Sequence, residues 1–139
     1  MKLQFNIEGQ NLQVYVPSVM VADTINYFEA DFVFLGNDWD GLSKWAHFRQ
    51  GERVYDLPLT EDRIPAEAGL NLGSGCWEVC VHGECYENNR VSKRIVTDLA
   101  RFTVETSGSL EGGDFPRPEI IAKLEPADYD LPRVYLSGT

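Results

Sequence analysis

Apolar and polar residues alternate along most of this chain, and this period of two constrains its fold more than any other feature. The segment KLQFNI places Leu3, Phe5 and Ile7 on one face, and YFEADFVFL repeats the pattern. Turn signals rich in Gly, Asn and Pro recur between residues 2 and 106, and no long amphipathic helix interrupts them. Roughly eight short strands of this kind predict an antiparallel β-sandwich or a small barrel.

Each predicted strand has an inward and an outward face. The first two strands read as a hairpin, and Pro17, which lacks a backbone N–H, predicts that the second strand ends there or lies at a sheet edge. In KWAHFRQ, Trp45 and His47 face away from the apolar side, and AEAG in the loop 60–75 predicts one helical turn. The residues expected inside are Leu3, Phe5, Ile7, Leu12, Val14, Val16, Phe28, Ala30, Phe32, Phe34, Ala46, Phe48, Trp77, Val79, Val81, Phe102 and Val104.

The segment GNDWDG, residues 36–41, contains acids two residues apart before a glycine, a pattern found in calcium loops. Aligning Asp38 and Asp40 with positions 3 and 5 of an EF-hand loop places Gly36 at position 1 and His47 at position 12. Both positions then lack the acidic ligand that such a loop requires. A looser cation site on the same acids and the neighbouring asparagine stays open.

The tryptophans of this region suggest a second interpretation, a sugar-binding platform built on Trp39 or Trp45. The third interpretation is a turn, because Asn and Asp side chains bond to nearby backbone groups and Gly accepts a positive φ. This fits the junction of two buried strands best. We therefore expect Trp39 and Leu42 to tuck over the end of the sandwich, with Asp38 and Asp40 holding the turn.

The three cysteines lie within ten residues of one another, at Cys76, Cys80 and Cys85. Their odd number argues against a disulfide framework, so free thiols are expected. On a strand, Cys76 and Cys80 lie about 13 Å apart, too far to bind one zinc. A turn centred on His82 and Gly83 would bring Cys80 and Cys85 together, so a bond between these two stays open.

The residues that could carry catalysis are few. His47 and His82 are the only histidines, and Ser74 lacks the strand–turn–helix context of a nucleophile elbow. GLNLGSG has neither the lysine nor the following helix of a phosphate-binding loop. The sequence therefore predicts no enzyme, no catalytic residue, no cofactor and no metal site.

The charge balance is strongly acidic, with 12 basic against 22 acidic residues and a net charge of −10. This disfavours nucleic acids and anionic membranes as partners. The only dense basic cluster is RVSKR, residues 90–94, which we interpret as a solvated strand face or turn. The N-terminus lacks the pattern of a signal peptide, and no segment approaches the roughly 20 apolar residues of a membrane span, so folding in a cytoplasm is expected.

The composition changes after residue 107, where SGSLEGGDFPRP reads as a linker. We divide the chain into a β-sandwich domain, residues 1–107, and a Pro/Gly linker with an extended C-terminal arm, residues 108–139. PEIIAKLE could start a helix, but the arm is too short for a second core. It either docks on its own domain or a partner, or stays loose. The apolar anchors expected to bind a partner are Phe115, Ile120, Ile121, Leu124, Tyr135 and Leu136.

Several segments also form an ordered series, of which DWDGL is the most specific part. The series consists of FxFxxxDWDGLxKxAxFRxG at residues 32–51, LPL at 57–59, IP at 64–65, GxWxVxVxG at 75–83 and RIVT at 94–97. Across residues 2–107 it resembles the N-terminal domain of tail and baseplate structural proteins from phages and prophages of Gram-positive bacteria. Upper baseplate proteins and receptor-binding fibre proteins carry such domains.

This resemblance implies an immunoglobulin-like β-sandwich that anchors a fibre or adaptor to the virion. The predicted function is that of a phage virion structural protein, a tail or baseplate adaptor or fibre-anchoring module. It would assemble with other virion proteins and as a homo-oligomer, in a virion assembled in the bacterial host cytoplasm. Relatives continue into a helical stem, but no heptads follow PEIIAKLE here, so a short structural protein is expected. A capsid (head) decoration or head-fibre protein is the alternative, and a carbohydrate-binding module is a further one.

Overall fold

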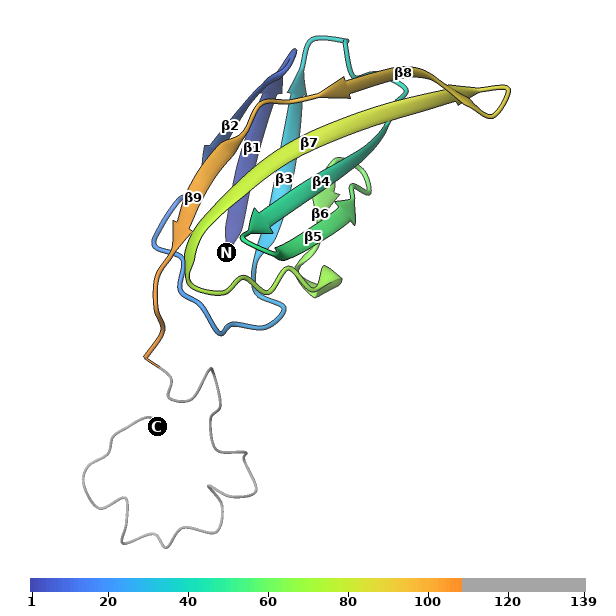
Figure 1. Ribbon diagram of the computed structural model, residues 1–139. Helices are drawn as coiled ribbons and strands as arrows, with labels where there is room; N and C mark the ends of the chain where they lie inside the picture. The colour runs from blue at the N-terminus through green and yellow to red at the C-terminus, as the bar shows by residue number, and fades with distance from the viewer. Residues whose placement is uncertain (109–139) are drawn as a thin grey trace, which may run out of the picture. The chain divides into compact units, whose positions relative to one another are not determined.

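Nine strands and one short 3-10 helix make up residues 1–108, the part of the chain that the computed structural model describes. The strands form two sheets that face each other (Figure 1). Their bounds are β1 Lys2–Glu8, β2 Asn11–Tyr15, β3 Glu29–Leu35, β4 Ser43–Gln50, β5 Arg53–Pro58, β6 Arg63–Ile64, β7 Gly75–Glu87, β8 Arg90–Val96 and β9 Ala100–Val104. The helical turn predicted at AEAG is the 3-10 helix Ala66–Ala68.

The first sheet has the strand order β2-β1-β3-β6. The predicted hairpin is confirmed, because β1 and β2 pair antiparallel, with Ile7 opposite Leu12. Strand β2 lies at the sheet edge and ends before Pro17, as expected. Strands β1 and β3, however, pair in parallel, with Phe5 opposite Phe32. Alternation does not encode the direction of a neighbouring strand, so neither this parallel pair nor the two-residue β6 was predicted.

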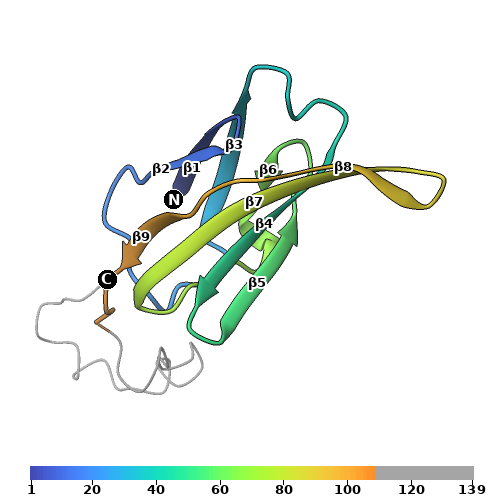
Figure 2. The ribbon, with the colours of Figure 1, turned by 45° about the horizontal axis from the view of Figure 1, so that its top comes forward.

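The second sheet is organised around β7, which has 13 residues. Strand β4 pairs with one edge of β7 and carries β5 on its own far side. The other edge of β7 pairs with two strands in turn: β9 lies along Gly75–Val79 and β8 along His82–Glu87. Figure 2 shows β7 running the length of this sheet, with β4 on one side of it and β9 and β8 on the other.

The core lies between the two sheets. Of the residues expected inside, Val14, Val16 and Phe34 are partly buried and pack against the core, and all the others are buried. The predicted all-β sandwich is confirmed, with sheets that are antiparallel except at the β1–β3 pair, while its immunoglobulin-like character stays a prediction. None of the residues described forms a helix long and apolar enough to span a bilayer.

The GNDWDG segment closes one end of the sandwich. Trp39 is only 1% exposed, and its indole Nε1–H donates a hydrogen bond to Gly9 O at 2.9 Å, so the predicted position of this side chain is confirmed. The turn itself is held by the backbone, since the Asp40 N–H donates to Asn37 O and the Leu42 N–H to Trp39 O, each at 3.3 Å. The expectation that the carboxylates of Asp38 and Asp40 hold the turn was wrong.

Strand β7 continues through His82 and Gly83, so the turn considered there is wrong. Gly83 lies inside the ladder, opposite Lys44 on one side and Ile95 on the other. The chain instead reverses at Asn88 and Asn89, whose φ angles of 54° and 63° are the positive values of a tight hairpin turn. Cys80 and Cys85 therefore lie along one extended strand, and all three cysteines are free thiols.

Gly83 also explains how Trp39 fits against β7. A Cβ at this position would lie 2.9 Å from two ring carbons of Trp39 and 3.0 Å from Leu42 Cδ1. We expect Gly83→Ala to lower the free energy of unfolding by about 1–3 kcal/mol, because the buried indole has no room to move. Urea unfolding measures the change, and Gly108→Ala, where a Cβ meets nothing within 4 Å, is the control. Equal stability of the two variants would contradict this account of the packing.

Candidate interaction surface

The solvent-facing side of the second sheet is its outer face, which carries the side chains that alternate with the core residues. Register places these side chains in cross-strand rows: Trp45 lies opposite His82, and His47 lies opposite both Asp56 and Cys80. Farther along β7, Glu84 lies opposite Arg94 and Glu78 lies opposite Arg101. The outer face is therefore more polar than the core side.

Two histidines form the centre of the outer face. The His47 and His82 rings stack with centroids 4.8 Å apart, and His47 Nε2 lies 2.6 Å from His82 Nδ1. On its other side, His47 Nδ1 lies 2.6 Å from Asp56 Oδ1. A carboxylate only accepts hydrogen bonds, so His47 Nδ1 carries the proton in the neutral pair. His47 Nε2 then accepts from His82 Nδ1–H, and His82 Nε2 is left as the site for an added proton.

The protonation of His82 is disfavoured by its surroundings. Partial burial lowers the pKa of His82 below its ordinary value of 6.5, and the nearby His47 lowers it further. Glu84 acts in the opposite direction, since its Oε2 lies 3.9 Å from His82 Nε2. Burial and the neighbouring histidine outweigh the carboxylate, so the folded protein favours neutral His82.

Cys80 lies opposite His47, so the two could in principle form a Cys–His pair with a nucleophilic thiolate. Burial raises the pKa of the Cys80 thiol, which favours the protonated form over the reactive thiolate. The nitrogen of His47 that a thiol would need for activation instead faces His82. The arrangement Asp56–His47–Cys80 is therefore a structural row and does not generate a nucleophile.

Ion pairs flank the histidines. Toward the β9 side, Glu78 accepts hydrogen bonds from Arg49 and Arg101, and these two bonds, Arg49's first, lower the pKa of Glu78. Toward the hairpin, Glu84 accepts from the Tyr86 hydroxyl and from Arg94 Nε, and both bonds, Tyr86's first, lower its pKa. These pairs favour the ionised form of both partly buried carboxylates.

The β7–β8 hairpin projects beyond the rest of the sandwich (Figures 1 and 2). Most of β8 is exposed, and it carries the basic cluster of residues 90–94. Apolar groups are exposed with it: Tyr86 is 60% exposed, Val91 41% and Val96 42%. The prediction that RVSKR is a solvated strand face is thus confirmed, and the strand is one edge of the second sheet.

The backbone of β8 presents hydrogen-bonding groups at this edge. The Thr97 N–H donates to Val81 O at 2.9 Å, so the backbone hydrogen-bonding groups of Thr97 point toward β7. Inward and outward backbone groups alternate along an antiparallel strand, which directs those of Val96 and Arg94 away from β7. Val96 O indeed accepts from the Gln10 side chain at 3.0 Å. Within residues 1–108, the outward backbone groups of Arg94 have no hydrogen-bond partner.

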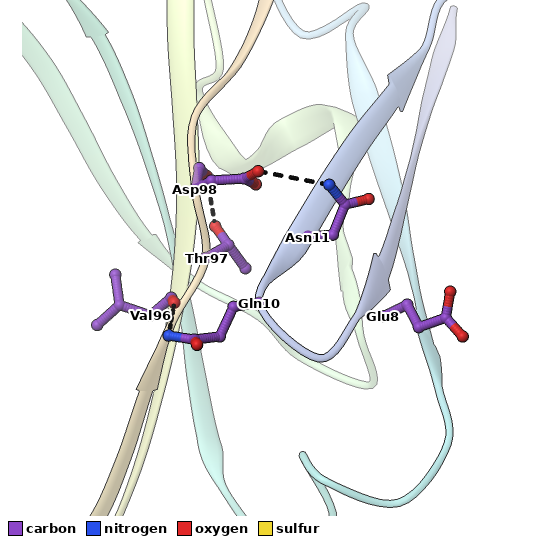
Figure 3. A pocket seen from close by; sticks show the side chains of 6 residues that line it. All are labelled: Glu8, Gln10, Asn11, Val96, Thr97 and Asp98. Carbon is purple, nitrogen blue, oxygen red and sulfur yellow. Dashed lines mark hydrogen bonds between the residues drawn. The ribbon is translucent and has the colours of Figure 1, made fainter.

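A small open hollow lies where β8 meets the β1–β2 turn (Figure 3). Its polar groups bond mainly to each other: Asp98 N–H donates to Gln10 O, and Leu12 N–H donates to Asp98 Oδ1, each at 2.8 Å. Thr97 bridges back to β7, since its hydroxyl accepts from Val81 N–H at 2.9 Å. These bonds tie the two sheets together, and we interpret the hollow as a structural joint.

The structure shows which of the candidate residues from the sequence are accessible to a ligand or partner. Trp39 is buried and cannot form a sugar platform, whereas Trp45 on the outer face is 38% exposed. The arm anchors Phe115, Ile120, Ile121, Leu124, Tyr135 and Leu136 lie outside the described residues. Sequence reasoning placed His47 on an outward face but missed its contact with His82, because only the pairing of β4 with β7 brings the two together.

Comparison with solved structures finds proteins of similar fold, one of which is a phage protein domain. The N-terminal domain of phage TP901-1 ORF48 is similar over 75% of this chain and 98% of that chain, with 13% sequence identity and a TM-score of 0.49. No family model and no curated protein sequence matches the chain.

The histidine pair predicts a dependence of stability on pH. Because the pKa of His82 is lower in the folded than in the unfolded chain, the unfolded chain binds more protons as the pH falls below about 6.5. The free energy of unfolding should therefore decrease between pH 7.5 and pH 5.5, before the carboxylates titrate. His82→Gln should show a smaller decrease. Urea unfolding across this range measures both slopes, and equal slopes would contradict the assignment.

Proposed function

We propose that this protein is a phage virion structural protein, a tail or baseplate adaptor or fibre-anchoring module that acts by protein–protein assembly. A capsid (head) decoration or head-fibre protein is the alternative location for the same kind of module. The proposal includes incorporation into the virion, assembly in the bacterial host cytoplasm and contacts with other virion proteins and with copies of itself. It includes no enzymatic activity, because neither Cys80 nor the histidines form an activated nucleophile.

The observation that carries this proposal is the projecting β7–β8 hairpin with its exposed edge strand. An edge strand with outward backbone groups can accept a strand from another chain, with backbone bonds providing affinity and side chains providing specificity. The ordered series of segments from Phe32 to Thr97, which resembles phage tail and baseplate domains, supports the same function. Repeated copies in a particle would add avidity to a single weak contact.

Removal of residues 109–139 tests the assembly function. Residues 1–108 form one compact unit with its own core, so the truncated protein should remain folded and monomeric. Without the arm it should no longer enter particles. Lysates of phage that carry the truncated gene, separated on a density gradient and probed for the protein, measure incorporation against the full-length control. Normal incorporation of the truncated protein would overturn the proposed role of the arm.

A second candidate function, glycan binding, has one observation in its favour: Trp45 is partly exposed on the outer face, where sugars stack on aromatic rings. If the protein is a carbohydrate-binding module, Trp45→Ala should weaken binding to a responsive glycan by about ten-fold or more. The buried Trp39 should give no such site. Calorimetric titration with host cell-wall glycans measures this, and the assembly function predicts no binding by either the wild type or the variant.

A further inference from the structure

We propose that the outer edge of β8 binds the acidic C-terminal segment, residues 125–136, of a second copy of this chain as an added strand. This deepens the proposed assembly function and rests on it, because it names the acceptor, the donor and the direction of the contact. The acceptor is the stretch of β8 from Arg90 to Ile95, since the outward carbonyl of Val96 already accepts from Gln10. The donor is EPADYDLPRVYL, which follows the linker.

The charge of β8 limits what can pair with it. Arg90, Lys93 and Arg94 lie on this one exposed strand, in a chain whose net charge is −10. Two copies of β8 pairing with each other would bring these cations together, and like charges across paired strands are destabilising. Basic residues on an edge strand commonly prevent such self-pairing. The edge therefore favours an acidic strand.

The C-terminal segment supplies that chemistry. Glu125, Asp128 and Asp130 are acidic and Arg133 is the one basic residue of the segment, so its formal charge is −2. In an extended chain, Asp128 and Asp130 point to one side, while Tyr129 and Leu131 point to the other. The acids could then face Arg90, because Arg94 already pairs with Glu84 and Lys93 Nζ donates to Asp38 O at 2.9 Å. The apolar side chains could cover Val91, which is 41% exposed on the hairpin.

The topology favours a second copy as the donor. Val104 at the end of β9 lies opposite Gly75 at the start of β7, whereas the hairpin begins at the other end of β7. These ends are roughly 40 Å apart, because a strand of 13 residues spans 12 rises of about 3.3 Å. The chain leaves the sandwich far from its own acceptor edge. Donor and acceptor at opposite ends give a head-to-tail contact, which closes into a ring when the rotation between copies permits.

A pair of variants at one position isolates the backbone contact. Arg94→Ala removes the ion pair with Glu84 but keeps the outward N–H, whereas Arg94→Pro removes both. An edge strand tolerates proline where its N–H faces solvent. Fluorescence anisotropy measures the binding of a labelled peptide of residues 118–139 to the folded unit 1–108. We expect Arg94→Pro to bind about ten-fold more weakly than Arg94→Ala, and added salt to weaken binding to the wild type.

Charge reversal provides a test that does not depend on proline. In the full-length protein, Arg90→Glu should shift the assembly toward monomer in light scattering after gel filtration, and Asp130→Lys in the same chain should restore it in part. The inference is overturned if the peptide does not bind residues 1–108, if the two Arg94 variants bind equally, or if the full-length protein stays monomeric. If full-length protein enters particles while the peptide does not bind residues 1–108, the proposed function stands and this contact fails.

Discussion

Strand β7 is the element on which the rest of the structure depends, because it belongs to the core and to the projecting hairpin at once. Its first half places Trp77, Val79 and Val81 in the core, fully buried, between β4 and β9. At Gly83 the missing Cβ makes room for the buried indole of Trp39, which closes the end of the sandwich. Beyond that point the strand continues out of the core with only β8 as its partner along Cys85–Glu87.

The outer face shows how one sheet supports both a stable core and a polar surface. Two arginines from neighbouring strands hold Glu78, and one arginine, Arg94, holds Glu84. The two histidines share one hydrogen-bonded row with Asp56. Exposed ion pairs of this kind contribute little stability individually. These ion pairs fix the side chains next to β8, the basic strand edge of an otherwise acidic chain. The positive charge of that edge favours an acidic partner strand over pairing with a second β8.

Sequence reasoning succeeded where the physical signal is local. Alternation assigned the inward side chains of β1, β3, β4, β7 and β9, and Pro17 correctly marked an edge strand, because both follow from the geometry of a single strand. It failed where the signal is shared between distant segments. The parallel pairing of β1 with β3 and the short β6 depend on neighbours that the strand itself does not specify. The turn considered at Gly83 failed for a related reason, since that glycine serves packing against Trp39.

By itself, the sequence determined the alternating faces, most of the turns, the acidic charge and the position of its one basic cluster, since each of these is a property of neighbouring residues. The tertiary structure alone decided which strands lie side by side. That choice brought His47 to His82, extended β7 into a hairpin and turned the basic cluster of residues 90–94 into an exposed sheet edge. Strand pairing joins residues far apart in the chain, and its energy comes from packing between whole sheets, which no local pattern contains.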